Sequence, residues 1–136
     1  MSQNPELAKK IADDIAVRME RSKTLIPVGV SNRHCHLTQE HFEALFGKGS
    51  SPKKIKDIKQ PGFWAAAESI EVQGPRGALK KVRLVAPYRS HTQIELAVSD
   101  AVALGLKPPV RESGDVKGSA GAVLVGPAGR VEIKEG

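Results

Sequence analysis

Apolar residues recur at every fourth position near the start of the chain, and charged residues fill most of the positions between them. This spacing predicts an amphipathic helix over residues 5–21. Asn4 is placed to cap the helix, with Pro5 at its first position. The apolar stripe is narrow, so the helix either docks on its own domain or binds another protein. Its members are Leu7, Ile11, Ile15 and Met19.

The pattern changes to a two-residue alternation after a short polar link. Ile26, Val28 and Val30 share one parity, which predicts a strand over residues 25–37 with these side chains facing a core. Thr38 then suits the N-cap of a short helix that Gly47 ends. Residues 47–62 are rich in Gly, Ser, Pro and Lys and are predicted to form a loop.

The second half of the chain reads as β-structure. Alternating segments flank two Gly-Pro-x-Gly turns, one at 74–77 and one at 126–129, and this repeat suggests a duplicated unit. A further strand is predicted over 92–98, and Ser99 is expected to cap a short helix after it. The expected fold class is mainly β, a small β-barrel domain with short helices, preceded by the N-terminal amphipathic helix. Residues 1–24 form the helix and linker, and 25–136 form the barrel.

Composition and charge narrow the function. The 136 residues include 21 basic and 15 acidic side chains, a formal charge of +6, which favours anionic partners. Only five aromatic residues are available to stack on bases, so small phosphorylated ligands are favoured over nucleic acid. No apolar run is long enough to span a membrane, and we expect a soluble, intracellular protein. The single cysteine forms no internal disulfide.

Two histidines surround that cysteine. His34 and His36 point to one face of an extended chain, whereas Cys35 points to the other and suits a buried filler. The imidazoles are either metal ligands or hydrogen-bonded polar residues, and spacing alone leaves both open. Glu95 lies on a polar strand face and either completes a metal site or is solvated. Arg89, just before it, either grips a phosphate or is an ordinary surface arginine.

Other catalytic signatures are missing. The sequence has no glycine-rich phosphate loop and no nucleophile elbow, which disfavours covalent catalysis. Several basic residues are able to bind a polyphosphate collectively, and a non-catalytic basic barrel therefore stays open as an alternative. They are Lys53, Lys54, Lys56, Lys80, Lys81 and Arg83.

Three stretches resemble one known family. They are IPVGVSNRHCHLTQEHFEALFG, QPGFWAAAESIEVQGPRGALKKVRLVAPYRSHTQIELAVSDA and GLKPPVRESGDVKGSAGAVLVGP. From about Ile26 to the end, the chain resembles the PduL-type phosphate propanoyltransferases of bacterial microcompartments. The resemblance implies a dinuclear zinc enzyme of two β-barrels that moves a short acyl group between coenzyme A and inorganic phosphate. The second barrel and its zinc ligands have no counterpart in these 136 residues.

The resemblance also assigns roles to individual residues. His34, His36 and Glu95 would hold one zinc, and Arg89 would bind phosphate. The positions that contact coenzyme A would be Ser31, Lys56 and Arg83. Cys35 stands where the family usually has an aliphatic residue, in keeping with a filler.

The same resemblance gives the N-terminal helix a partner. Family members often begin with an amphipathic helix that targets the enzyme to the lumen of a bacterial microcompartment in the cytoplasm. The stripe of Leu7, Ile11, Ile15 and Met19 would then bind a shell protein. A half metal site also exposes core surface and favours self-association into a homo-oligomer. A non-catalytic fragment that binds anions or coenzyme A, or acts as a cargo module, remains the alternative.

Overall fold

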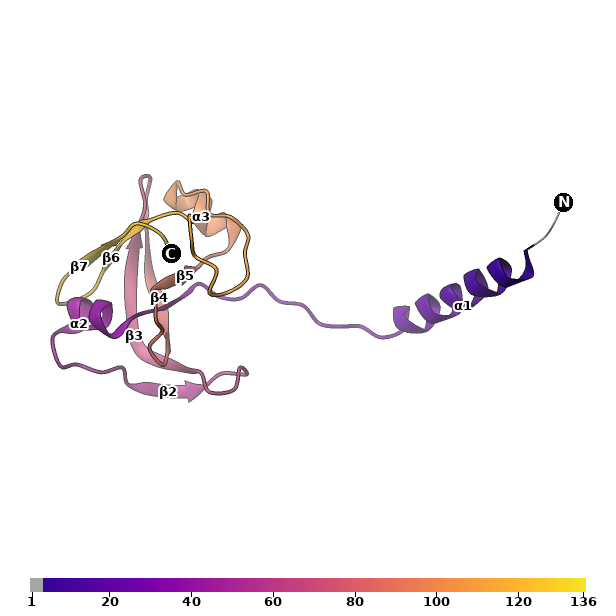
Figure 1. Ribbon diagram of the computed structural model, residues 1–136. Helices are drawn as coiled ribbons and strands as arrows, with labels where there is room; N and C mark the ends of the chain where they lie inside the picture. The colour runs from indigo at the N-terminus through magenta and orange to yellow at the C-terminus, as the bar shows by residue number, and fades with distance from the viewer. Residues whose placement is uncertain (1–3) are drawn as a thin grey trace. The chain divides into compact units, whose positions relative to one another are not determined.

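The computed structural model describes residues 4–136, which divide between Val30 and Ser31 into two units. The first unit holds α1 (Pro5–Ser22), shown in indigo in Figure 1. The Asn4 side chain accepts a hydrogen bond from the backbone N–H of Leu7 at 3.2 Å, so the predicted cap is confirmed. No residue of α1 is buried. Among the described residues, no helix is both long enough and apolar enough to cross a membrane.

The strand predicted over 25–37 is largely wrong. Residues 25–33 form no strand, and the side chains of Ile26, Val28 and Val30 are 80–92% exposed. Strand pairing begins only at His34. The strands on either side pair with His34, Cys35 and His36 and with no earlier residue of this segment. The apolar alternation at 26–30 is therefore present in the sequence, but these residues belong to no strand.

The second unit is a mixed sheet with two short helices, as Figure 1 shows. Its elements are β1 (His34–His36), α2 (Gln39–Phe46), β2 (Lys54–Asp57), β3 (Trp64–Gln73), β4 (Ala78–Ala86), β5 (Gln93–Glu95), α3 (Val98–Leu104), β6 (Ala122–Val125) and β7 (Arg130–Ile133). The strands run in the order β5-β1-β4-β3-β6-β7, with β2 paired to β3. Among the described strands, only β1 and β4 pair in parallel. After β7 the chain returns to β5, where the N–H of Ile94 donates to the carbonyl of Gly136 at 2.8 Å. The sheet thus curls into a half-barrel, and the predicted mainly β barrel class is confirmed.

The core lies inside this curl. Alternate residues of the strands point inward, as in a sheet with one apolar face. Buried members include Ile70, Val72, Val82 and Leu84, with Phe42 and Leu45 from α2. Cys35 is fully buried among them, and burial raises the pKa of its thiol to about 12. It is the filler that the sequence predicted, and such a thiol is unsuited to nucleophilic catalysis.

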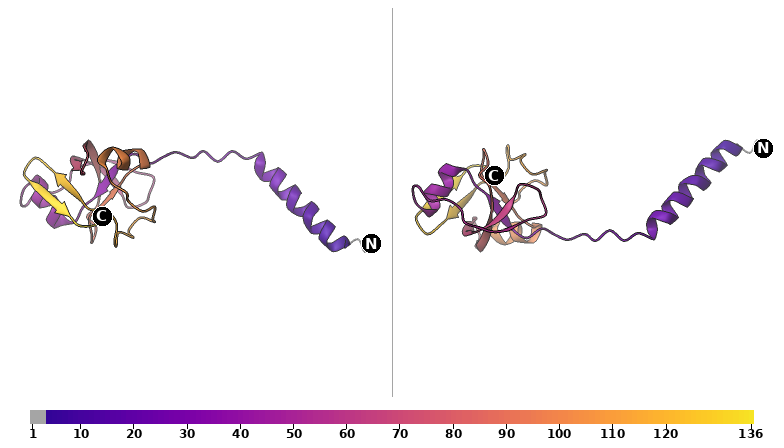
Figure 2. Two further views of the ribbon diagram at one scale, coloured as in Figure 1. Left: turned by 90° about the horizontal axis from the view of Figure 1, so that it is seen from above. Right: turned by 90° about the horizontal axis from the view of Figure 1, so that it is seen from below.

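Both Gly-Pro-x-Gly turns close hairpins and cap helices. In the β3–β4 turn, the N–H of Arg76 donates to the carbonyl of Leu104 at the end of α3, at 3.0 Å. In the β6–β7 turn, the N–H of Ala128 donates to the carbonyl of Leu45 near the end of α2, at 2.9 Å. Both views of Figure 2 accordingly show α2 beside the β6–β7 hairpin. Each turn supplies a donor to a helix-end carbonyl that would otherwise lack one.

Three local features of the structure differ from what the sequence predicts. The predicted loop 47–62 contains β2, an exposed strand whose backbone pairs with β3 despite its lysines. The strand predicted over 92–98 is only three residues long. The helix after it begins at Val98 and has Ala97 as its N-cap, so Ser99 lies inside the helix and does not cap it. Thr38 does cap α2, accepting the N–H of His41 at 3.1 Å.

Candidate metal centre

Three candidate ligands converge from two paired strands. β1 and β5 are antiparallel, with His34 opposite Glu95, and residues two apart on a strand share a face. His34 Nε2 lies 3.3 Å from Glu95 Oε2, and His36 Nε2 lies 3.5 Å from Glu95 Oε1. One ligand atom from each residue lies within 4.8 Å of the other two. Within residues 4–136, this is the one group of three metal-ligating side chains gathered so closely.

Both imidazoles are oriented by backbone carbonyls. His34 Nδ1 lies 2.9 Å from the carbonyl of Asn32, and His36 Nδ1 lies 3.1 Å from that of Val85. A proton on each Nδ1 donates to these carbonyls and leaves the lone pair on Nε2, which faces Glu95. This is the arrangement that metal-binding histidines usually show. The donor set of two imidazoles and one carboxylate fits zinc.

Electrostatics keep one imidazole neutral. Burial is the main cause that lowers the pKa of His36 to about 4, and the positive charge of Arg89 and the neighbouring His34 contribute to this lowering. His36 is therefore unprotonated at neutral pH, and only the neutral form binds a metal.

Arg89 stands beside this group. Its backbone N–H donates to the carbonyl of Leu37 at 3.0 Å, which ties the arginine to the end of β1. Its guanidinium carbon lies 5.3 Å from the centre of the Phe63 ring, and Nη1 donates to Ser113 Oγ at 3.1 Å. The arginine is half-buried and held in place, unlike an ordinary surface arginine.

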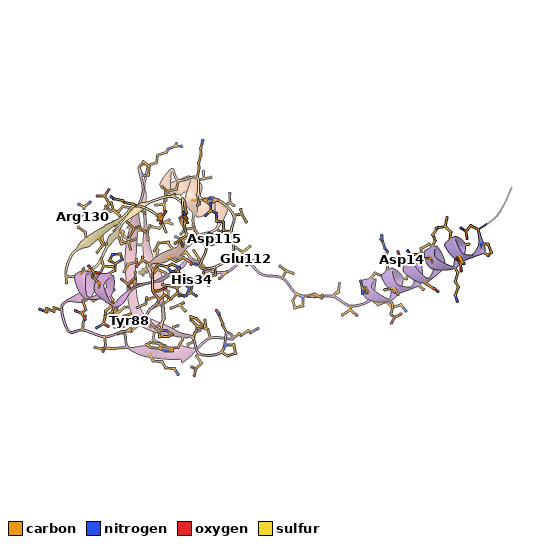
Figure 3. The ribbon with its side chains drawn as sticks, in the orientation of Figure 1. Asp14, His34, Tyr88, Glu112, Asp115 and Arg130 are labelled. Carbon is orange, nitrogen blue, oxygen red and sulfur yellow. The ribbon has the colours of Figure 1, made fainter. Side chains whose placement is uncertain are left out.

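Ser113 is a site residue that the sequence analysis missed. Its hydroxyl donates to Glu95 Oε1 at 3.0 Å and accepts from Gln93 Nε2 at 3.0 Å and from Arg89. Ser113 lies in the long loop between α3 and β6, where no local pattern distinguishes one polar residue from the next. Figure 3 labels His34 together with Glu112 and Asp115 of this loop. Only the fold could have identified this contact.

A cavity of about 420 Å³ opens beside the same loop. Glu95 and Ser113 contribute polar atoms to its wall, and the rest is mostly apolar. The apolar lining includes Leu96, Val98, Val102, Leu106 and Val110.

The residues expected to contact coenzyme A lie apart from one another along the chain. Ser31 precedes β1, and Lys56 lies on the exposed strand β2. Arg83 is opposite His34 in the β1–β4 register, and its Nη1 donates to the carbonyls of Ala66 and Ala67 at 3.1 and 2.8 Å. These carbonyls are free for Arg83 because the β3–β4 ladder is interrupted between Ala65 and Ser69.

His91 stays outside the group. Its Nδ1 shares a hydrogen bond with Ser90 Oγ at 3.1 Å, and its Nε2 is buried without a partner among the described residues.

The half-barrel thus brings two oriented imidazoles, a carboxylate and a fixed arginine together as a candidate metal centre. The model of the phosphate propanoyltransferase family matches residues 27–136, and the chain belongs to this family. Over 130 residues it is 48% identical to a phosphate propanoyltransferase of Rhodobacter capsulatus, covering 96% of this chain and 60% of that protein. A relative of the same name from Thermotoga maritima is 47% identical over 115 residues, covering 85% of this chain and 54% of the relative. The chain thus spans little more than half the length of these relatives.

Proposed function

We propose that this domain supplies the metal-binding part of a phosphate acyltransferase, which moves a propanoyl group between coenzyme A and inorganic phosphate. The observation that supports it best is the juxtaposition of Arg89 with the group of His34, His36 and Glu95 in a chain of this family. The cofactor is zinc, which the three side chains hold. A bound zinc ion supplies Lewis acidity that stabilises the thiolate of coenzyme A as a leaving group.

The protein's own part is to hold phosphate in place. The guanidinium of Arg89 presents parallel N–H donors to an anion, and Phe63 and Ser113 fix its position. A phosphate held there lies next to the group that binds the thioester, so the attack gains chiefly from proximity. No side chain need act as a covalent nucleophile, in keeping with the buried, protonated thiol of Cys35.

Coenzyme A would contact one serine and two basic side chains. Ser31, Lys56 and Arg83 are all exposed, and the charges of Lys56 and Arg83 favour its phosphates. The largely apolar cavity beside Glu95 has room for a short acyl chain.

We expect Arg89→Ala to raise the phosphate KM and to lower kcat, because the anion loses its charged anchor. The measurement is phosphate-dependent thiol release from propanoyl-CoA with zinc present. It is made on the 136-residue chain, alone and mixed with the remaining part of the Rhodobacter capsulatus relative. Arg130→Ala is the matched control, since Arg130 is exposed on β7. Phosphate kinetics that are equal in the two variants would remove Arg89 from the reaction.

We also propose that α1 binds a shell protein of a bacterial microcompartment and so places the protein in its lumen. Its stripe of Leu7, Ile11, Ile15 and Met19 is 50–63% exposed, and no residue of the helix is buried. An apolar helix face of this kind suits a hydrophobic groove on a partner.

Charges on the stripe should abolish this binding. We expect the double variant Ile11→Glu, Ile15→Glu to lose co-sedimentation with assembled shell protein, because the carboxylates would be desolvated in the groove. Asp13→Lys changes charge on the opposite side of the helix and should bind as the parent chain does. Equal binding by all three chains would contradict the proposed role of the stripe.

A further inference from the structure

The half-barrel contains two copies of one unit. A strand followed by a helix occurs as β1–α2 and again as β5–α3, and each is followed in the chain by a hairpin with a Gly-Pro-x-Gly turn. Each helix is capped by the hairpin of the other copy, since the β3–β4 turn caps α3 and the β6–β7 turn caps α2. Gly74 thus corresponds to Gly126, and Leu45 to Leu104.

The sheet registers agree with a two-fold relation between the copies. Cys35 of β1 pairs with Ile94 of β5, and Val72 of β3 pairs with Leu124 of β6. In both pairs the two residues occupy equivalent positions in the two copies, as a two-fold axis between them requires. The parallel contact of β1 with β4 is repeated where Ile94 meets Gly136.

Side-chain cross-links repeat as well. Arg33, just before β1, pairs with Asp100 of α3 at 2.9 Å. Thr92, just before β5, bonds to His41 of α2 at 2.7 Å. These are the same two positions in the two copies, joined once by an ion pair and once by a neutral hydrogen bond.

Four side chains therefore surround the two-fold axis on one face of the β1–β5 ribbon. His34 corresponds to Gln93, and His36 corresponds to Glu95. We call His34, His36, Gln93 and Glu95 the quartet. Three members form the candidate metal centre, and the fourth, Gln93, is 5% exposed and lies directly opposite His36.

The amide of Gln93 is fully engaged with its neighbours. Its Nε2 donates to Glu95 Oε1 at 2.7 Å, and its Oε1 accepts the N–H of Gly114 at 2.7 Å. Ser113 donates to the same oxygen of Glu95 at 3.0 Å. A carboxylate oxygen accepts about two hydrogen bonds, so Oε1 is occupied and Oε2, which faces His34, remains for a cation.

We propose that Gln93 is a positioning residue. Its hydrogen bond holds Glu95 so that one carboxylate oxygen faces the metal, and Gln93 itself stays out of the coordination. The inference rests on the proposed zinc site. Gln93 itself contributes no ligand atom, which leaves a coordination position open for substrate, as catalytic zinc sites require.

The test measures zinc affinity of the 136-residue chain by competition with a chromophoric chelator. Gln93→Met keeps the volume but removes the donor to Glu95, and we expect affinity to fall roughly 10- to 100-fold, as for other outer partners of metal ligands. Gln73→Met is the matched control, because Gln73 Nε2 donates to Glu71 Oε1 at 2.6 Å with the same two-residue spacing on β3. The control should bind zinc as the parent chain does.

A second variant tests the geometry in the opposite direction. The two-fold relation places position 93 opposite His36, just as His34 lies opposite Glu95. A histidine introduced by Gln93→His should therefore add a fourth ligand. We expect zinc affinity to rise at least tenfold, with a stronger visible absorption band of the cobalt-substituted protein from a closed tetrahedral set.

The outcomes separate the two levels of the proposal. A parent chain that binds no zinc overturns the zinc site and this inference together. A parent chain that binds zinc while Gln93→Met matches Gln73→Met overturns the positioning role alone. Unchanged affinity and cobalt spectrum in Gln93→His would show that position 93 does not face the metal, which also overturns the inference.

Discussion

Replacing either His34 or His36 by alanine should abolish zinc binding at this centre. Each variant leaves two of the three ligands, and the remaining pair no longer surrounds the ion. The loss should exceed the roughly 10- to 100-fold cost of removing an outer partner of a metal ligand. The measurement is zinc content after dialysis against a fixed free zinc concentration, with one ion per chain expected for the parent protein.

His41→Ala provides the control for this experiment. His41 is also partly buried and hydrogen-bonded, but it lies on α2 and bonds to Thr92 outside the group of ligands. It should retain zinc. Full zinc retention in both His34→Ala and His36→Ala would reject the ligand assignment.

Gly126→Ala should strongly destabilise the half-barrel. A Cβ atom at this position would lie within 3.0 Å of the backbone carbonyl group and the Cβ atom of Leu45, and none of these atoms is the far end of a flexible side chain. Overpacking of this kind costs about 1–3 kcal/mol and sometimes more, and the turn would also lose its hydrogen bond to the helix. The measurement is the urea midpoint of unfolding, followed by circular dichroism.

Gly29→Ala is the matched control, because a Cβ at Gly29 meets no atom within 4 Å. Its midpoint should stay close to that of the parent chain. Gly74→Ala should resemble Gly126→Ala, since its Cβ would meet the carbonyl of Leu104 in the same way. A stable Gly126→Ala variant would mean that the turn does not pack on α2 as described.

The sequence predicted those parts of the fold that local pattern determines. Helix α1, the cap at Thr38 and both hairpins follow from periodicity and turn residues within a few positions. The prediction of a strand at 25–30 was wrong, because alternation shows only that a segment is able to pair. Pairing itself depends on a neighbouring strand elsewhere in the chain. The strand β2 was missed for the opposite reason. Its exposed lysines are typical of a loop, although its backbone pairs with β3.

The candidate site was predictable to a similar extent. The spacing of His34 and His36 placed both imidazoles on one face, and the family resemblance, not periodicity, joined Glu95 and Arg89 to them. The role of Ser113 was not predictable from the sequence, because a serine in a polar loop has no local signature. Its contact with Glu95 also joins residues eighteen positions apart in the chain. The role of Gln93 depends on sheet register, which no pattern in the sequence reveals.

The duplicated unit has a consequence for how such a site can evolve. If the two halves were separate, identical subunits, both strands at the axis would carry the same side chains, and the ligands would come in matched pairs. Joining the halves in one polypeptide frees each strand to change alone. One strand then specialises in imidazoles while its counterpart carries an acid and an amide. The result is an asymmetric chemical environment on a symmetric scaffold, with imidazoles on one side of the axis and an acid and an amide on the other.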